Sequence, residues 1–370
     1  MGIFSRKPRD GPAAHSAGTH SKHHNDKGTP YYSMSSRPSF GQWLKHTWLD
    51  IVTMIIMGAI GLGVYEAHPA PTRSFPVLFS DGEIVYPEFA YPLRKEIIPI
   101  WAAAMLAALV PIFVFLVMQI RVRSFWDVNN AVIGLLYSLI TAAVFQVFIK
   151  WLIGGLRPHF LTVCQPDISL ATNSADGGYN AAGFKQIYYT SEICTGDRNQ
   201  IDDSLESMPS GHTTAAFAGF VYLYLYLNAK LKVFSNYHPA MWKLIAIYAP
   251  ILGACLIGGA LTIDEFHNWY DIFAGAVIGS VMAFSSYRMT YAAIWDWRIN
   301  HIPLNRGAAF DFGNAELTHA TFTRKVGWGT STGGGLSGHH AYGHDRNSSI
   351  GNSGVSRKPV GSGRAPEAMF

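Results

Sequence analysis

The sequence has few charged residues: Asp, Glu, Lys and Arg make up 14% of its 370 residues, against about 25% in typical soluble proteins. It has only three cysteines, too few for a disulfide-rich scaffold. Its formal net charge of +4 is weak for a protein that binds nucleic acid. Residues 1–40 lack the apolar segment of a cleavable signal peptide. We therefore exclude a charged soluble domain, a small disulfide scaffold and a nucleic-acid-binding domain.

Hydrophobic residues are abundant, at 49% of the chain, and they gather in its middle. Residues 1–47 and 299–370 are polar and rich in Gly, Ser and His, a composition that does not form a packed core. We expect a disordered cytosolic N-terminal arm over residues 1–46 and a six-span membrane domain over residues 47–290. Residues 291–370 are expected to form a cytosolic, largely disordered C-terminal tail.

Six runs without charged residues lie in the membrane domain: Ile51–Tyr65, Ile97–Ile120, Val128–Ile149, Thr213–Ala229, Leu244–Ile263 and Ile272–Tyr287. A bilayer core of about 30 Å needs roughly 20 helical residues. The second, third and fifth runs reach that length alone, and the others reach it with their polar flanks. The sequence therefore predicts an all-α membrane protein, a bundle of six transmembrane helices.

The basic residues are distributed unequally between the two sides of such a bundle. The side that holds both termini carries 21 Lys and Arg residues, and the opposite side carries 7. The positive-inside rule then places both termini in the cytosol. The loops over residues 66–96, 156–211 and 264–270 would face the lumen or the exterior. This pattern fits an endomembrane (vacuole, Golgi or endoplasmic reticulum) and the plasma membrane equally well.

Two of the three cysteines, Cys164 and Cys194, fall in the same predicted outer loop. Disulfides persist on the oxidising side of a membrane. We therefore regard this pair as a candidate disulfide, with two free thiols as the alternative.

Three clusters of polar residues lie at span ends on that same side. They are Lys150 with Arg157-Pro158, Pro209-Ser210-Gly211-His212, and His267 with Asp271. Ionisable groups at membrane depth are costly to desolvate, so their presence there indicates a functional site.

Each cluster suits a phosphoryl group. Lys150 and Arg157 are about two helical turns apart, so both can face one anion. Ser210 and Gly211 open a helix, whose first N–H groups are unpaired and can bind phosphate. Taken singly, each cluster has a simpler interpretation: cations extending toward lipid headgroups, or an ordinary helix cap.

The third cluster supplies a nucleophile. His267 and Asp271 are four residues apart, on one face of a helix. The carboxylate can hold the Nδ1 proton and leave Nε2 as the nucleophile. His212, on another helix, would be a separate acid. A purely structural His–Asp pair is the alternative.

In this order and spacing, the clusters resemble the three signature motifs of the type 2 phosphatidic acid phosphatases, which are integral-membrane lipid phosphate phosphatases related to the vanadium haloperoxidases. The similarity covers roughly residues 45–290, and it extends to the segment after Arg157 and to Phe79–Pro87 in the first outer loop. It implies a haloperoxidase-like helical core. It also implies hydrolysis of lipid phosphates such as phosphatidate, lysophosphatidate and diacylglycerol pyrophosphate, without a metal or other cofactor and independently of Mg²⁺.

The resemblance also implies residue roles. His267 would attack phosphorus to form a phosphohistidine, and Asp271 would orient it. His212 would protonate the leaving alkoxide and then help to activate water. The phosphoryl oxygens would be held by Lys150, Arg157, Ser210 and the Gly211 amide. The partner is a phospholipid in the bilayer, and no nucleic acid is involved.

The third motif departs from the family pattern Ser-Arg-x5-His-x3-Asp, because Ala260 and Leu261 stand at its Ser-Arg positions. Losing one such donor costs about 10²- to 10³-fold in rate. Lys185 or Arg198 from the long outer loop could replace the arginine, and so could a divalent cation bound by Asp264 and Glu265.

The alternative function is therefore a catalytically impaired, lipid-phosphate-binding or regulatory membrane protein. A transporter is disfavoured, because the spans contain few polar residues.

Overall fold

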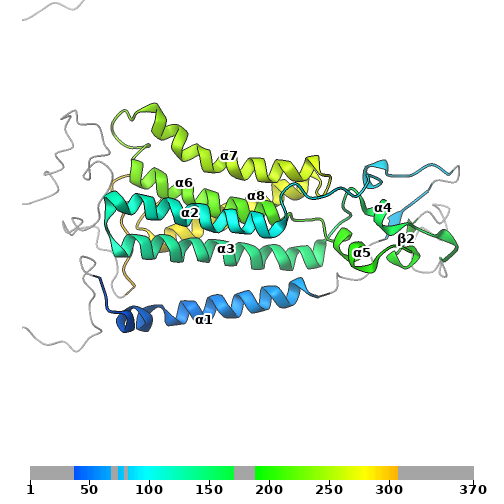
Figure 1. Cartoon of the computed structure of the whole chain (residues 1–370), viewed down its shortest axis with the longest axis horizontal. Coiled ribbons are helices and arrows are strands. Elements are labelled where there is room, and N and C mark those ends of the chain that lie inside the picture. Colours follow the sequence, from blue (N-terminus) through cyan, green and yellow to red (C-terminus); the bar gives the residue numbers. More distant parts are fainter. Residues whose placement is uncertain (1–36, 68–73, 79–81, 171–187, 307–370) are drawn as a thin grey trace, which may run out of the picture.

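The computed structural model describes residues 37–67, 74–78, 82–170 and 188–306 (Figure 1). Within these ranges six long helices dominate: α1 (Phe40–Tyr65), α2 (Ile100–Val122), α3 (Phe125–Ile153), α6 (Gly211–Leu231), α7 (Met241–Ile263) and α8 (Trp269–Thr290). The shorter elements are α4 (Phe160–Cys164), α5 (Arg198–Ser204), the strands β1 (Phe75–Pro76) and β2 (Tyr188–Tyr189), and 3-10 turns at Pro87–Phe89, Ile168–Leu170 and Ser191–Ile193. The predicted all-helical class is confirmed.

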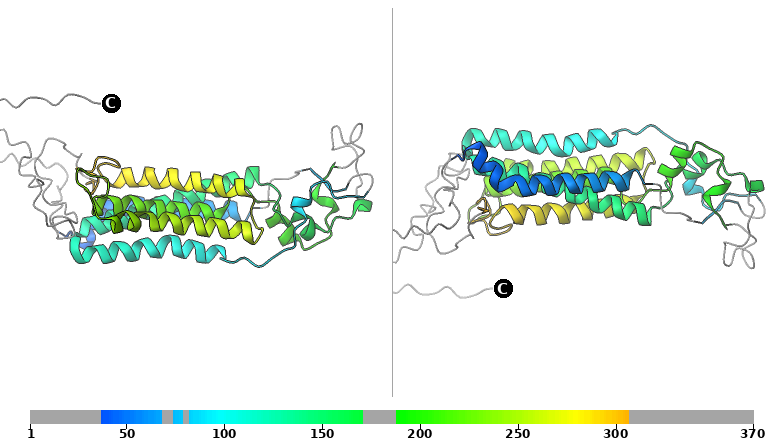
Figure 2. Two further views of the ribbon diagram at one scale, coloured as in Figure 1. Left: turned by 90° about the horizontal axis from the view of Figure 1, so that it is seen from above. Right: turned by 90° about the horizontal axis from the view of Figure 1, so that it is seen from below.

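Helix α6 is the centre of the bundle. It packs against α8 most extensively, and also against α7, α2 and α3, while α1 contacts α3 at the edge (Figures 1 and 2). Of its 21 residues, 18 are buried. The helices around it instead carry many exposed large apolar side chains, as expected for surfaces that face lipid.

Five helices, α1, α2, α3, α7 and α8, are long and apolar enough to cross a membrane. The protein is therefore an integral membrane protein. Helix α6, with 21 residues, is long enough to span but is not apolar enough to be among them. Its sequence contains four Thr or Tyr hydroxyls among residues 213–224, and its neighbours rather than lipid surround it. That α6 forms a sixth membrane span therefore stays a prediction.

Two glycines of α8 allow close contact with α6. A Cβ at Gly275 would lie 2.7 Å from the carbonyl oxygen of Ser210, and one at Gly279 would lie 2.5 Å from that of Thr214. Real Cβ atoms do not approach backbone so closely. The start of α6 is thereby brought against the start of α8, which carry the second and third polar clusters.

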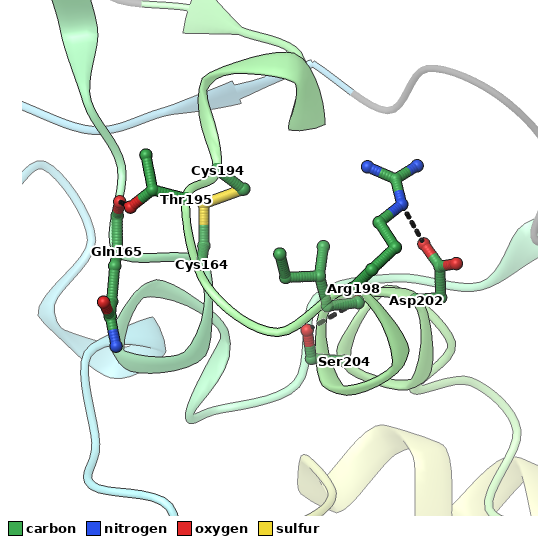
Figure 3. Close-up of a disulfide and its surroundings, with 8 residues drawn as sticks. Cys164, Gln165, Cys194, Thr195, Arg198, Asp202 and Ser204 are labelled. Carbon is green, nitrogen blue, oxygen red and sulfur yellow. Dashed lines mark hydrogen bonds and ion pairs between the residues drawn. A yellow bond between two sulfur atoms is a disulfide. The ribbon is translucent and has the colours of Figure 1, made fainter.

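A small lobe lies beyond the end of the bundle where α3 ends and α6 begins (Figure 1). We call it the end lobe, and it comprises residues 74–78, 82–99, 154–170 and 188–210. Strand β1 pairs antiparallel with β2 there, with Phe75 opposite Tyr189. Phe75, Phe160 and Ile193 form its own buried cluster. Cys164, at the end of α4, is bonded to Cys194 (Figure 3). This disulfide joins the segment that follows Arg157 to the segment that leads into α5.

Reducing this disulfide should destabilise the end lobe. The loop that it closes spans a sequence separation of 30, and such closure is worth about 3 kcal/mol on the chain-entropy model. We expect dithiothreitol, or the double replacement Cys164→Ser and Cys194→Ser, to lower the thermal midpoint of the detergent-solubilised protein by several degrees. Cys255→Ser is the matched control, because Cys255 is free and exposed. An unchanged midpoint would contradict this expectation.

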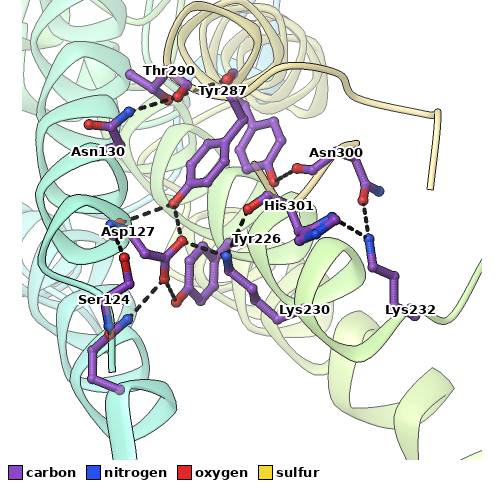
Figure 4. A network of polar contacts seen from close by, with 12 residues as sticks. Ser124, Asp127, Asn130, Tyr226, Lys230, Lys232, Tyr287, Thr290, Asn300 and His301 are labelled. Carbon is purple, nitrogen blue, oxygen red and sulfur yellow. Dashed lines mark hydrogen bonds and ion pairs between the residues drawn. The ribbon is translucent and has the colours of Figure 1, made fainter. Parts of the chain in front are cut away.

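The opposite end of the bundle is closed by a buried polar network (Figure 4). Lys230 of α6 forms an ion pair of 2.5 Å with Asp127 of α3, and Tyr226 donates a hydrogen bond to the same carboxylate. Lys230 also donates to the carbonyl of His301. Residues 291–306, in the segment predicted as tail, are therefore packed against the helices.

The other predicted boundary also falls inside ordered structure. Helix α1 begins at Phe40, because the Ser39 hydroxyl and the Gln42 side chain form a capping box there. It thus begins within the segment predicted as an arm. Most of that arm, up to residue 36, and the tail from residue 307 lie outside the described residues.

Candidate active site

A cavity of about 320 Å³ lies where α3 ends and α6 begins. Titratable side chains gather on its wall: Tyr65, Glu96, Lys150, Arg157, Asp203, His212 and His267. Small and apolar residues of α2, α3 and α6 continue the wall into the bundle: Ile100, Ala104, Ala143, Val147 and Ala215. One polar end and one apolar side suit an amphiphile whose head is charged.

Lys150 and Arg157, the first cluster, both line the cavity, but not as two residues of one helix as predicted. Helix α3 stops at Ile153, so Lys150 and Arg157 are not two turns apart on one helix. Gly154 ends the helix with φ +53°, and a Cβ there would lie 2.6 Å from the Leu205 carbonyl oxygen. This turn brings Arg157 back toward Lys150, and both line the cavity.

Each of these two cations already faces a carboxylate. Lys150 lies 3.5 Å from Glu206, and the buried Arg157 lies 2.6 Å from Asp203. The Nε atom of Arg157 is buried and has no hydrogen-bond partner within the described parts of the chain. A buried unpaired donor is costly. Asp203 thus fixes the guanidinium through Nη2, and the Nε–H group is left unpaired in the cavity wall among the described residues.

The second cluster forms the start of α6. Ser210 is the N-cap, and its hydroxyl accepts from the Thr213 amide at 3.4 Å. Gly211 and His212 line the cavity, whereas Ser210 lies behind its wall. Gln146 of α3 holds this turn by donating to the Pro209 carbonyl at 3.0 Å. A contact between Ser210 and phosphate stays a prediction.

His212 projects into the cavity and is almost completely buried. Its Nε2 lies 3.9 Å from Glu96, beyond hydrogen-bond length, and has no hydrogen-bond partner among the described residues. Its ring centroid is 6.5 Å from that of His267. The two imidazoles thus line the same cavity close to each other.

His267 lies just before α8 rather than within it, so the predicted helical face is wrong. Asn268 is the N-cap of α8, and Asp271 completes a capping box with it. This cap still brings Nδ1 of His267 to 3.7 Å from Oδ2 of Asp271. That distance is within ion-pair reach but longer than a hydrogen bond.

Burial lowers the pKa of His267, and the charges of Arg157 and Lys150 lower it further, although Asp271 opposes the shift. The imidazole is therefore neutral near pH 7. A neutral ring whose Nδ1 faces a carboxylate has Nε2 as its free nucleophilic atom.

Several residues of the site were not predicted from the sequence. Glu96, Asp203 and Glu206 have no fixed spacing to any motif, and their only signal is that they lie in the loops of one side. Burial raises the pKa of both Glu96 and Glu206. His159 was also missed: its Nδ1 lies 3.1 Å from the Glu265 carbonyl oxygen, which links the Arg157 segment to the loop before His267.

In the structure, too, no side chain from the arginine position of the third motif reaches the cavity. Leu261 is fully buried and is not on the cavity wall. Arg198 does not replace the arginine, because it is exposed and pairs with Asp202 on α5. Lys185 lies outside the described residues.

The two acidic residues of that motif are held by the protein. Asp264 accepts hydrogen bonds from the amides of Ile97 and Phe266. Glu265 lies 3.5 Å from Arg94. Among the described residues, no group of three or more His, Cys, Asp or Glu side chains is arranged to hold a metal ion.

Comparison with known proteins places the chain. Residues 131–295 match the PAP2 superfamily. Lipid phosphate phosphatase 1 of Arabidopsis thaliana is 33% identical over 67% of this chain and 68% of its own length. The chain therefore belongs to the type 2 phosphatidic acid phosphatase family.

Other relatives point the same way. Lipid phosphate phosphatase 2 of Arabidopsis thaliana is 31% identical over 68% of this chain and 78% of its own length. Diacylglycerol pyrophosphate phosphatase 1 of Saccharomyces cerevisiae is 26% identical over 67% of this chain and 80% of its own length. No solved structure matches the chain.

Proposed function

We propose that this protein is a lipid phosphate phosphatase that removes phosphate from membrane lipids through a phosphohistidine intermediate. The observation that carries the proposal is that His267, His212, Lys150 and Arg157, which are far apart in the sequence, line one cavity. The family and the names of the relatives support a phosphatase. Phosphatidate, lysophosphatidate and diacylglycerol pyrophosphate are the proposed substrates.

In the first step, Nε2 of His267 attacks phosphorus and the bond from phosphorus to the ester oxygen breaks. His212 enters this step protonated and gives that proton to the leaving alkoxide, which departs as an alcohol. Asp271 faces the Nδ1 proton and stabilises the positive charge that develops on the ring. Lys150 and Arg157 balance the negative charge on the phosphoryl oxygens.

In the second step, His212 is neutral and accepts a proton from water as that water attacks the phosphohistidine. Inorganic phosphate leaves and His267 returns to its neutral form. His212 carries the transferred proton in both steps and recovers it from water, so the scheme requires no metal ion and we expect activity without Mg²⁺.

The cavity also indicates how a lipid is held. Its polar end lies at one end of the bundle, and its apolar wall on α2, α3 and α6 extends toward the bilayer. The phosphate of a lipid can thus reach His267 while its chains stay in the apolar region. We place this end on the lumenal or external side, in agreement with the disulfide nearby.

The second candidate function is a lipid-phosphate-binding protein without turnover. Leu261 at the arginine position favours it. So do Asp203 and Glu206 beside the two cations and Glu96 beside His212, because these carboxylates oppose an incoming anion.

Phosphate release from phosphatidate by the purified protein in detergent separates the two functions. We expect release in EDTA, with no further increase after Mg²⁺ is added. Binding of phosphatidate without release, repeated for lysophosphatidate and diacylglycerol pyrophosphate, would instead support the binding protein. Release that depends on Mg²⁺ would contradict the metal-free mechanism and direct attention to Asp264 and Glu265.

A further inference from the structure

One buried hydroxyl contacts the carboxylate that faces the nucleophile. Ser207 Oγ donates a hydrogen bond of 2.6 Å to Oδ2 of Asp271. The exposed fraction is 1% for Ser207 and 0% for Asp271. Ser207 does not line the cavity, so its hydroxyl reaches the reaction only through Asp271.

The oxygen that Ser207 bonds is the same one that faces His267. Oδ2 also accepts from the amide of Asn268 at 2.9 Å and from its side chain at 3.3 Å. Oδ1 is buried without a partner among the described residues. The position and the charge of the whole carboxylate therefore depend on the donors to one atom.

Hydrogen bonds from Ser207 and Asn268 have two consequences for this atom. They hold the carboxylate in place, because hydrogen bonds from Ser207 and Asn268 converge on Oδ2. They also occupy the lone pairs of the oxygen that lies 3.7 Å from Nδ1 of His267.

We propose that Ser207 is a positioning residue of this enzyme: its hydroxyl fixes the Asp271 carboxylate against the loop before α8 and sets the orientation and basicity of His267. This inference rests on the proposed function. It differs from a role in folding alone, in which Ser207 would only join the segment before α6 to α8.

The other titratable groups around His267 come from two places. Asp264 and Glu265 precede it in its own loop, and six line the same cavity: Tyr65, Glu96, Lys150, Arg157, Asp203 and His212. None of them is bonded to Ser207. Removing the hydroxyl therefore changes the surroundings of His267 through Asp271 alone.

Ser207→Ala provides the test, with Ser204→Ala as its matched control. Ser204 is also fully buried, but its hydroxyl donates to the Ile201 carbonyl within α5. We expect Ser207→Ala to lower kcat for phosphatidate by roughly 10- to 100-fold, as the loss of a hydrogen-bond partner of a metal-binding histidine does, and to leave KM unchanged. Ser204→Ala should match the wild type in both constants.

The pH profile gives a second measurement. Without the Ser207 donor, Asp271 becomes a better acceptor for the Nδ1 proton and raises the pKa of His267. The acid limb of kcat/KM, which reports protonation of the nucleophile, should then move to higher pH. An unchanged limb, or a loss of activity that merely follows the unfolded fraction in a thermal melt, would overturn the proposal.

A readout that needs no turnover separates this inference from the proposed function. In protein labelled with ¹⁵N-histidine, the signal of His267 is assigned by its loss in His267→Gln and is titrated in both serine variants. A higher titration midpoint in Ser207→Ala than in Ser204→Ala supports the positioning role even if phosphate is never released. Equal midpoints refute it, and an inactive wild type refutes the proposed function instead.

Discussion

Replacing His267 with glutamine will reduce phosphate release from phosphatidate by at least about 10³-fold, since loss of a nucleophile is among the most costly changes that an enzyme can undergo. Glutamine keeps a polar side chain of similar volume in this buried position, so the bundle should stay folded. The measurement is the initial rate of phosphate release at saturating substrate in detergent. His238→Ala is the control, because His238 is exposed in the loop between α6 and α7.

The covalent intermediate gives this prediction a direct test. Wild-type protein mixed with lipid that carries a radiolabelled phosphate and quenched in alkaline detergent should retain label, because phosphohistidine survives base and is lost in acid. His267→Gln should retain none. Label that persists in the variant would mean that another residue attacks phosphorus.

Replacing His212 with glutamine will affect substrates differently according to their leaving group. This difference separates its role as an acid for the leaving group from its role in activating water. General acid catalysis contributes about 10²- to 10⁴-fold, so the variant should lose that factor with phosphatidate, whose alkoxide needs a proton. An activated aryl phosphate needs none, and its first step should proceed. Because His212 also assists the attacking water, the phosphohistidine should then accumulate.

The measurement for His212→Gln is the amount of alkali-stable label that the aryl phosphate leaves on the protein, beside the rate with the lipid. Wild type should show little label at steady state, and the variant much more. Equal losses with both substrates and no accumulated label would assign His212 a role in binding rather than in proton transfer.

The sequence was most informative where chemistry depends on residues close together in the chain. The pattern Pro209-Ser210-Gly211-His212 predicts a helix start, and Ser210 caps α6 in the structure. His267 and Asp271 do face each other. The reason expected from their spacing was wrong, because a capping box at Asn268 rather than a helical face brings them together.

The pairing of the cations could not be predicted in the same way. Lys150 and Arg157 were expected to await an anion, but Glu206 and Asp203 lie beside them. These partners come from residues about 50 positions later in the chain. Their position depends on how the end lobe folds over the bundle, which local periodicity does not encode.

A helical membrane protein with polar groups suited to phosphate at its span ends can be predicted from the chain alone, because hydrophobic length and local spacing are properties of short segments. The central place of α6 in the bundle and the bond from Ser207 to Asp271 emerge only from the folded chain. Those contacts arise from side-chain volumes that must fit across helices. Gly275 and Gly279, for example, let α8 approach α6 where any Cβ would collide.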